Sequence, residues 1–468
     1  MTARLARISN QLCQSTCLLN KTKSEPRSVI IIGSGAFGLS TALRLQTEGF
    51  SVTVIDALED ESDARSNSRD NSRMVRTCYG GDAIYTPLAR RSILSWQEQQ
   101  QRYDPLEEKK VPLYHSDGVL FVGHGDSLAT ERASYETALK DPFEKDHVEW
   151  LGSQQELNNK APQLGFCANE QGFWMDLAGH VNSELALQHV AERLREAGGQ
   201  VRFRCVVRRL LFHDANAMDK VVGVQLENGE RLYCDELIVC AGAWTGDLLK
   251  HWRVPDIPKL TPVPQMLVYV RPPSHKSQQE IEALRNMPCF ADDVHCGGYY
   301  AFPLLPLTLG DGRTVEAVKF AQHADGLSHH PSELLYDSRL RLSYGEHEAD
   351  RLLRRMRHRV PSVFEDPSNH GKCARQLVRT KVCYYCDTED GNFLVDRHPS
   401  VGGLSVATGG SGHAFKFVPV LGTVVAACLD LVPLPNGKDD KPEWPSLELM
   451  RERFSWTRDR ATAEGARR

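Results

Sequence analysis

Three glycines near the start of the chain have the spacing of a site for a dinucleotide. Residues 33–38 read G-S-G-A-F-G, a G-x-G-x-x-G pattern. Gly33 permits a tight turn, Gly35 lets the backbone approach a pyrophosphate, and Gly38 allows a helix to pack closely on a strand. Asp56 follows Gly33 by 23 residues and can accept hydrogen bonds from ribose hydroxyls. These residues predict a dinucleotide site and leave NAD and FAD open.

The flanking segments supply the elements that such a site requires. Residues 29–32 form a continuous β-branched apolar run, which is typical of a parallel strand buried on both faces. A helical pattern follows the glycines and ends near Gly49, and residues 51–55 alternate as a second strand. A helix that begins at the glycine turn offers free N–H groups and a positive dipole end to phosphates. This context makes the motif more specific than its glycines alone.

Two arginines and two cysteines are further candidates for chemistry. Arg73 and Arg76 stand three residues apart in S-R-M-V-R, which starts at Ser72. Taken alone, they are compatible with a pair of solvated surface cations. Cys383 and Cys386 form a C-x-x-C, but no second pair lies nearby, so the spacing does not favour a zinc site.

Length and composition indicate an ordinary enzyme of two intertwined domains. The chain has 468 residues, of which 41% are hydrophobic and 25% are charged. A net charge of −5 gives no electrostatic footprint for nucleic acid, and no apolar run reaches the roughly 18 residues needed to cross a membrane. Thirteen scattered cysteines favour reduced thiols in an intracellular protein.

The later segments suggest that the nucleotide domain is discontinuous. Helices are expected at 86–103 and 181–197, and a strand at 236–239 leads into the small-residue turn 241–244. This strand and turn fit a return of the chain to the nucleotide domain. Between them, short strand-like pieces after residue 111 are typical of a second, sheet-rich region.

The second half of the chain again changes from a sheet-rich region to segments that fit the nucleotide domain. Strands at 266–270 and 299–305 precede a Gly-Asp-Gly turn at 310–312, which predicts a hairpin. A strongly basic helix at 346–359 is expected to present a solvated face. A glycine-rich turn then leads to a final helix at 418–431.

Five segments in a fixed order resemble a known family. They read G-S-G-A-F-G, S-R-M-V-R, A-G-A-W, C-Y-Y-C-D-T-E-D-G-N-F-L-V-D and A-T-G-G-S-G-H-A-F-K, and they span most of residues 28–425. The chain resembles the D-amino-acid-oxidase superfamily of flavoenzymes, and within it the branch of monomeric sarcosine oxidase, pipecolate oxidase and fructosyl amino acid oxidase. This resemblance implies FAD, and no second G-x-G-x-x-G for NADPH is present.

The resemblance implies an α/β fold of the two-domain α+β type, in which a Rossmann-like FAD-binding domain is interleaved with a sheet-rich substrate domain. We expect the FAD-binding domain at 29–110, 176–250 and 383–432, and the substrate domain at 111–175 and 251–382. Residues 1–28 would be an N-terminal extension, and 433–468 a loose tail.

The family's flavin attachment and oxygen site transfer to particular residues. Family members carry a cysteine that binds the flavin 8α-methyl group ten residues before a phenylalanine, and Cys383 has this spacing to Phe393. Cys386 is the competing cysteine, out of register by three. Lys319 and His323 have the four-residue spacing of the oxygen-activating lysine and the active-site histidine.

The family's substrate carboxylate is held by an arginine and a lysine that correspond to Arg76 and Lys416. The resemblance thus implies catalytic roles for Lys319, His323, Tyr300 and Arg73, and substrate binding by Arg76, Lys416 and Tyr385. The residues expected to bind the cofactor are Gly33, Gly35, Ala36, Phe37, Gly38, Asp56, Ser72, Cys383, Gly410, Gly412, His413 and Lys416. No metal ligand is expected.

The chain departs from the family near the flavin. Bacterial sarcosine oxidases read S-H-H-G-D-T-R-I-I-R, whereas this chain reads S-N-S-R-D-N-S-R-M-V-R, which lacks the histidines and has Arg69 and Asp70 in their neighbourhood. This departure argues against a simple sarcosine oxidase. Residues 328–345 also have the character of an insertion over the substrate side.

The expected reaction is oxidation of the C–N bond of a secondary amine, such as sarcosine, pipecolate, saccharopine or a fructosyl amino acid. The products would be an imine, which hydrolyses in water, and hydrogen peroxide, with FAD as the cofactor and O₂ as the electron acceptor. The alternatives are a flavin dehydrogenase that uses another acceptor, and a biosynthetic oxidase of a bulky natural-product amine. A flavin-bound interaction protein without activity is a third reading.

The expected partners are the small-molecule amine and O₂, with neither nucleic acid nor membrane, and the chain is expected to be a monomer. An intracellular location, cytoplasmic or peroxisomal, is favoured, although the chain ends in Gly-Ala-Arg-Arg rather than S-K-L. Residues 1–28 are basic, which fits either a mitochondrial-type presequence or, as we favour, a disordered lead-in.

Overall fold

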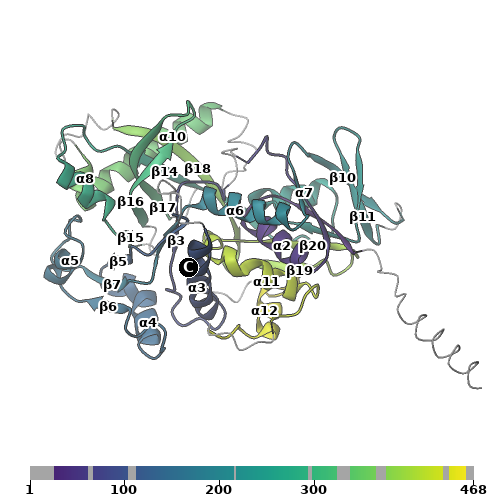
Figure 1. Ribbon diagram of the computed structural model, residues 1–468, viewed down its shortest axis with the longest axis horizontal. Helices are drawn as coiled ribbons and strands as arrows, with labels where there is room; N and C mark the ends of the chain where they lie inside the picture. The colour runs from purple at the N-terminus through teal and green to yellow at the C-terminus, as the bar shows by residue number, and fades with distance from the viewer. Residues whose placement is uncertain are drawn as a thin grey trace, which may run out of the picture.

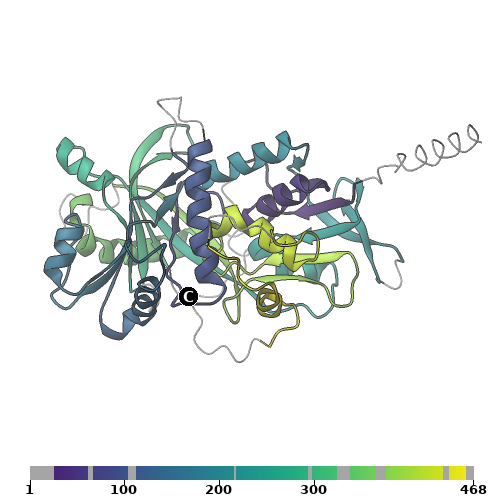
Figure 2. The same cartoon turned by 60° about the horizontal axis from the view of Figure 1, so that its bottom comes forward.

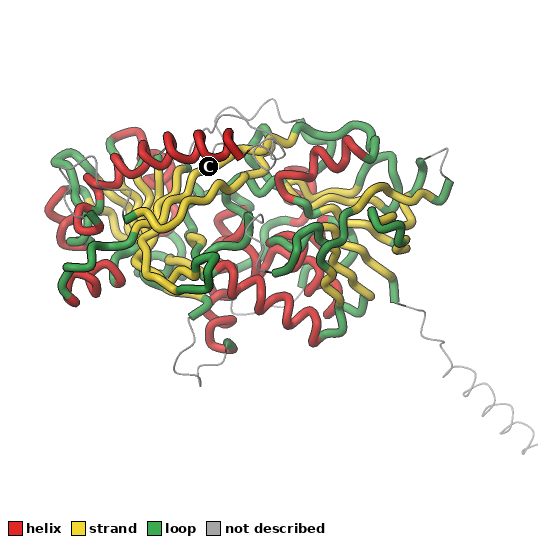
Figure 3. The backbone as a smooth tube through the Cα atoms, turned by 90° about the horizontal axis from the view of Figure 1, so that it is seen from above, coloured by secondary structure: helices red, strands yellow, loops and turns green. Residues whose placement is uncertain are grey.

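The computed structural model describes residues 26–61, 67–103, 112–214, 218–293, 298–323, 338–364, 376–435 and 442–459, with side chains of the helix that starts at Ser338 described from residue 349. Two lobes lie side by side, each built around one large sheet (Figure 1). Seen from above, strands fill the middle of the left lobe with helices around its edge, and strands and helices form adjacent layers in the right lobe (Figure 3). The predicted two-part α/β architecture is confirmed.

The first lobe contains a six-stranded sheet in the order β19-β20-β13-β1-β2-β9. Its strands are β1 (Ser28–Ile32), β2 (Ser51–Ile55), β9 (Gln200–Arg202), β13 (Glu236–Val239), β19 (Leu394–Arg397) and β20 (Leu404–Thr408). All neighbours pair in parallel except β19 and β20. Val29 and Ile31 face packed helices, while Ile30 and Ile32 face a second, three-stranded sheet. Burial on both faces explains the unbroken apolar run of β1.

Helices α2 (Ala36–Thr47), α6 (Ser183–Glu196) and α11 (Val418–Cys428) cover the first face of this sheet. The second face is covered by β10 (Val207–Phe212), β11 (Val221–Leu226) and β12 (Arg231–Tyr233). Helices α2 and α11 approach closely at Gly422, where a Cβ would collide with the carbonyl oxygen of Ser40. Helix α2 is thereby held between the sheet and α11.

The second lobe contains an eight-stranded sheet in the order β18-β14-β17-β16-β15-β5-β7-β6. Its strands are β5 (Val119–Gly123), β6 (Val148–Leu151), β7 (Gln171–Met175), β14 (Leu260–Val270), β15 (Cys289–Asp292), β16 (Tyr299–Thr308), β17 (Thr314–Gln322) and β18 (Leu377–Thr388). Strands β16 and β17 pair from Thr308 and Thr314 outward, which confirms the hairpin predicted at 310–312.

A small sheet, β3-β8-β4, and one long helix complete the part of the fold that bears on the site. The strands are β3 (Arg73–Val75), β4 (Tyr114–His115) and β8 (Gly179–Val181). Helix α3 (Tyr85–Arg102) runs between the two lobes (Figure 2). The remaining α-helices that the structure describes are α4 (Ala129–Ala138), α5 (Gln154–Lys160), α7 (Thr245–His251), α8 (Gln278–Arg285), α10 (Ser338–Arg359) and α12 (Leu447–Phe454). Within the described residues, no helix has the length and apolar character needed to span a membrane.

The solvated face expected for the basic helix at 346–359 is present in the described part of α10, where Arg351, Arg354 and Arg355 are exposed, but the helix also buries its opposite face. Leu352, Leu353 and Met356 are buried against the eight-stranded sheet. Arg359 is also buried, and its guanidinium donates to Glu170 at 2.5 Å and to Asp292 at 2.7 Å. The arginines between the apolar residues obscured a stripe with helical spacing.

The expected loose tail is wrong where α12 lies. Ser446 caps this helix, and Met450 and Phe454, four residues apart, are fully buried in the first lobe. Residues 383–388, assigned above to the FAD-binding domain, continue β18 and pair with β14 in the other lobe's sheet. The remaining domain limits stay a prediction, and much of the insertion predicted at 328–345 lies outside the described residues.

Candidate active site

The glycine turn between β1 and α2 has the geometry that its spacing predicts. Gly33 has φ of +109°, and a Cβ there would collide with the carbonyl oxygen of Cys240. A Cβ on Gly38 would collide with the carbonyl oxygen of Gly33. Gly35 precedes α2, which has no acidic residue in its first turn, and Ala36 N donates to Ser68 Oγ at 3.1 Å. The turn places the positive N-terminal end of α2 beside glycines that have no side chain, which suits a phosphate.

Asp56 lies where the second strand meets this turn. Its Oδ2 accepts hydrogen bonds from Ser34 N at 2.6 Å and from Ser34 Oγ at 2.7 Å, and its Oδ1 accepts one from Leu58 N at 3.1 Å. The carboxylate therefore fastens the turn to β2. Its contact with a ribose hydroxyl stays a prediction.

A pocket extends from the glycine turn toward the eight-stranded sheet and encloses about 800 Å³ of empty space, open solvent included. A second pocket of about 590 Å³ adjoins it. Arg73, Tyr300, Tyr385, Gly412 and Phe415 line both pockets, so the two spaces share one wall. The first pocket also contains Ala36, Phe37, Cys383 and Gly410 in its lining. The structure thus brings together residues that the sequence places more than 300 positions apart.

The two cysteines of the C-x-x-C lie on opposite faces of β18. Cys383 Sγ is 4.0 Å from Arg73 Nη2, and Tyr385 follows on the same face. Cys386 Sγ is 3.4 Å from Thr408 Oγ1, and burial raises the pKa of this thiol to about 11. Both cysteines line the first pocket, but Cys383 shares its side with the residues that the sequence predicts to be catalytic.

Lys319 is fully buried on β17 and does not face solvent. Its Nζ donates to Ser72 O at 2.7 Å and to Ser72 Oγ at 3.3 Å, and lies 2.6 Å from Asp70 Oδ2. The Nζ also lies 4.6 Å from the ring centre of Phe302. Lys319 lines neither pocket, whereas Arg73 lines both. Of these two cations, only Arg73 lies at the pocket wall, and Lys319 lies behind it, bound to the neighbouring Ser72.

Asp70 is the residue that sequence reasoning missed in this cluster. Its carboxylate pairs with Lys319, accepts from Arg73 Nη1 at 2.7 Å, and accepts a hydrogen bond from the buried hydroxyl of Tyr269. Although burial alone would raise it, Lys319 and Arg73 hold the pKa of Asp70 well below its usual range. The available signal is an acid in an arginine-rich segment, at the point where the chain departs from the family's sequence.

Burial lowers the pKa of Lys319 to about 8, while the Asp70 carboxylate opposes this shift. Two cations and one carboxylate leave the cluster with one net positive charge when Lys319 is protonated. Because the surroundings are dry, this charge acts more strongly than it would in water.

A second pair of cations lies at the far side of the second pocket. Lys416 Nζ donates to Tyr79 OH and to His413 O, both at 2.8 Å. Arg76 donates to Cys78 O, and its guanidinium lies 4.9 Å from the ring centre of Tyr79 and 5.5 Å from that of Phe121. Trp96 Nε1 of α3 donates to Lys416 O at 2.8 Å, which fixes the lysine backbone.

In the part of the chain that the structure describes, neither Arg76 nor Lys416 forms an ion pair with a carboxylate. The nearby acids have other partners, because Asp70 pairs with Lys319 and Arg73, and Asp82 pairs with Arg453 at 2.6 Å. Burial lowers the pKa of Lys416 well below its usual value, and the charge of Arg76 lowers it further. Both side chains line one pocket. Their arrangement suits an anion.

Aromatic and imidazole side chains form the rest of the second pocket. Tyr385 OH lies 3.3 Å from His323 Nδ1, and burial raises the pKa values of Tyr385 and Tyr300, so both remain neutral phenols at pH 7. His413 Nδ1 lies 3.0 Å from Tyr79 OH, and its Nε2 lies 3.1 Å from Gly391 O. Tyr79, which links His413 to Lys416, belongs to no recognised motif and was missed by sequence reasoning.

The sequence model of the family described as "DAO: FAD dependent oxidoreductase" matches residues 28–428. The chain belongs to this family. FAD is the family's cofactor. The glycine turn, the N-terminal end of α2 and the first pocket fit it. The cysteine attachment is a separate question.

Named relatives place the chain near oxidases of amines and amino acids. It is 27% identical over 400 residues to monomeric sarcosine oxidase of a Bacillus species, covering 85% of this chain and 90% of that protein. It is 28% identical over 420 residues to L-saccharopine oxidase of Schizosaccharomyces pombe, covering 86% and 89%. It is 26% identical over 400 residues to N-methyl-L-tryptophan oxidase of Escherichia coli, covering 85% and 93%.

Solved structures show the same fold. A fructosyl peptide oxidase from E. terrenum has a TM-score of 0.68 at 20% sequence identity, covering 94% of each chain. Fructosamine oxidase from Aspergillus fumigatus, Amadoriase II, has a TM-score of 0.64 at 19% identity, covering 95% of this chain and 94% of that one. At these identities the comparison concerns the fold.

Proposed function

We propose that this protein oxidises the C–N bond of a secondary amine that carries a free α-carboxylate, with O₂ as the electron acceptor. The products are an imine, which hydrolyses in water, and hydrogen peroxide. The observation that carries this proposal is the buried pair Arg76 and Lys416, which lines a pocket beside the FAD site without a carboxylate partner among the described residues. Bound FAD supplies the two-electron chemistry.

The cation pair gives the substrate its orientation. Arginine can hold both oxygens of a carboxylate in a fork, and lysine adds a point charge. A carboxylate between Arg76 and Lys416 relieves the repulsion that lowers the pKa of Lys416. The sarcosine-, saccharopine- and N-methyltryptophan-oxidising relatives support an amino-acid substrate, while the size of its side chain stays open.

The lining of the second pocket also favours the neutral form of the substrate amine. It contains the cations Arg73, Arg76 and Lys416, and no acidic residue among the described lining. Nearby positive charge disfavours an ammonium ion. A neutral amine retains the lone pair that C–N oxidation needs, and Tyr300 and Tyr385 provide a dry aromatic wall for it.

The cluster of Asp70, Arg73 and Lys319 is proposed to serve the reaction with O₂. Reduction of O₂ develops negative charge, and a fixed positive charge in a dry site stabilises it. Asp70 keeps both cations in place and ionised, so we assign it a positioning role. Gly33, Gly35, Gly38 and the end of α2 would hold the FAD phosphates.

Oxygen uptake by the purified flavoprotein tests this function directly. A panel of N-substituted amino acids, each paired with its amide and its decarboxylated amine, should give peroxide with the acids and little with the paired compounds. Anaerobic bleaching of the flavin without oxygen uptake in air would instead show a dehydrogenase. No bleaching by any compound of the panel would contradict the proposal.

FAD is further proposed to be attached through Cys383. Replacing Cys383 with serine should release the yellow colour into the supernatant after acid precipitation, whereas the wild-type pellet should stay yellow. Cys386→Ser is the matched control, because Cys386 lines the same pocket from the other face of β18. Release by Cys386→Ser alone would move the attachment to that residue, and colour in the wild-type supernatant would show that the flavin is not covalent.

The pH dependence of flavin reoxidation should report Lys319. Its pKa is lowered to about 8, so the ammonium form dominates below that pH and is lost above it. The rate of reoxidation by O₂ in stopped flow should therefore fall as the pH rises through about 8. The break should be absent in Lys319→Met, and a break that persists in this variant would assign the titration to another group.

A further inference from the structure

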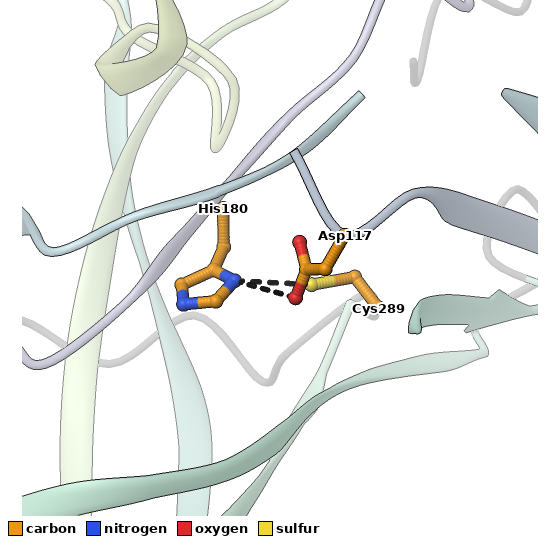
Figure 4. Close-up of side chains that lie close together, drawn as sticks. All are labelled: Asp117, His180 and Cys289. Carbon is orange, nitrogen blue, oxygen red and sulfur yellow. Dashed lines mark hydrogen bonds and ion pairs between the residues drawn. The ribbon is translucent and has the colours of Figure 1, made fainter. Parts of the chain in front are cut away.

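Three metal-ligating side chains meet at a point outside the two pockets (Figure 4). Asp117 lies between β4 and β5, His180 lies on β8, and Cys289 begins β15. Asp117 Oδ2 is 2.9 Å from His180 Nδ1, and Cys289 Sγ is 3.8 Å from the same nitrogen. All three donor atoms lie within 4.8 Å of one another.

The arrangement differs from that of a nucleophilic cysteine activated by histidine. Such a site places the cysteine and the acid on opposite ring nitrogens, so that a proton can pass along the chain. Here both groups face Nδ1, and one nitrogen cannot serve as donor to Asp117 and acceptor from Cys289 at the same time. Donors that converge on one point are typical of ligands around a metal ion.

An unsatisfied oxygen gives an independent indication of a missing ligand. Asp117 Oδ1, the carboxylate oxygen that does not face His180, is buried and has no hydrogen-bond partner among the described residues, so it is available to a water or to a second bond to an ion. Buried polar atoms nearly always have a partner, and an exception often marks an ion or a water. His180 and Cys289 are almost completely buried, at 2% and 0% exposed, so their donor atoms face one another and not bulk water.

We propose that Asp117, His180 and Cys289 bind a zinc ion. Zinc bonds of about 2.0–2.3 Å place two ligands of the same ion about 3–4 Å apart, and the two measured separations fall close to that range. Thiolate and imidazole favour zinc over magnesium or calcium. The side chain of Asp117 is 22% exposed, which leaves an approach for a water as the fourth ligand.

The charges and protons of this site balance. Binding breaks the S–H bond of Cys289 and forms a Zn–S bond, and the thiol proton leaves to solvent. The imidazole of His180 binds in its neutral form, and its proton moves from Nδ1, where it faces Asp117, to Nε2, so that Nδ1 is free to bind the ion. One thiolate and one carboxylate neutralise the divalent ion, so the buried site carries no net charge.

The position of the site suggests that zinc supports the wall of the substrate pocket. His180 pairs with Met74 across β8 and β3, and Met74 lines the second pocket. Ala291, two residues after Cys289 on β15, lines the same pocket. An ion held by both strands would join the small sheet, which carries Arg73, to the eight-stranded sheet.

Metal content of the intact flavoprotein tests the proposal without reference to activity. After incubation with Zn²⁺ and desalting into metal-free buffer, mass spectrometry should find about one zinc per chain in the wild type. Cys289→Ser and His180→Gln should each contain at least tenfold less zinc per chain than the wild type. Cys234→Ser, which changes a buried cysteine in another core, should retain it.

Thermal unfolding provides a second readout if one variant folds poorly. Added Zn²⁺ should raise the Tm of the wild type and of Cys234→Ser, and it should leave the Tm of Asp117→Asn unchanged. Wild-type protein that retains less than a tenth of a zinc per chain would overturn the proposal. Retention of zinc by Cys289→Ser at the wild-type level would overturn it as well.

Discussion

Replacing Lys319 with methionine should slow reoxidation of the reduced flavin by O₂ by a factor of about 100–1,000. Methionine fills similar space but removes the ammonium group from its place between Ser72 and Asp70. Loss of one preorganised electrostatic partner in a dry site costs about 3–4 kcal/mol in activation free energy. Stopped-flow measurement of the two half-reactions separates the steps, and anaerobic reduction by the amine should change much less.

Lys381→Met is the matched control for this experiment. Lys381 is another buried lysine, and its Nζ donates to Arg69 O at 2.5 Å in the same neighbourhood. Its loss should affect stability more than the reaction with O₂. Equal slowing of both half-reactions in Lys319→Met would show that Lys319 holds the site together and has no specific role toward oxygen.

Replacing Arg76 with alanine should lower kcat/KM for the carboxylated substrate roughly 30- to 1,000-fold. This corresponds to a loss of about 2–4 kcal/mol of transition-state stabilisation. The substrate carboxylate would then be buried against Lys416 alone and would lose its bidentate partner. Arg76→Lys should recover part of the loss, because it restores the charge without the fork. Steady-state oxygen consumption over a range of substrate concentrations measures the effect.

Arg91→Ala serves as the control for Arg76→Ala. Arg91 is a buried arginine of α3 that donates to Pro442 O at 2.6 Å, away from both pockets. It should leave kcat/KM within a few-fold of the wild type. If Arg76→Ala turned over an amine and its carboxylated parent with unchanged relative efficiency, the pair with Lys416 would be structural, and the carboxylate requirement would be wrong.

Local sequence patterns were sufficient for the unit of β1, α2 and β2 that begins the nucleotide half of the fold. The glycine spacing, the apolar run of β1 and the alternation of β2 each reflect contacts within a few tens of residues. Gly33 and Gly38 meet backbone atoms at the predicted turn, because only a residue without a Cβ fits there. Such constraints depend only on residue type and spacing, so they can be predicted without the tertiary structure.

Helix α10 and helix α12 show where this reading fails. Both carry charged residues between apolar ones, and the charge density concealed the stripe that each buries. Whether a basic helix is solvated depends on the surface it meets, as the buried pairing of Arg359 with Glu170 shows. Propensity and composition contain no information about that distant surface.

The site combines both kinds of information. Motifs were sufficient to single out Arg76, Lys416 and Lys319 as candidate site residues. Their partners could not be predicted, because Lys416 and Arg76 come together only when α3 and β3 are packed between the lobes. Asp70 gained its importance in the same way, since its partners Lys319 and Tyr269 lie on β17 and β14. Sequence by itself determined the family, the cofactor turn and the candidate cations. Only the tertiary structure decided which cations are paired and which face an open pocket, because burial and pairing are properties of segments far apart in the chain.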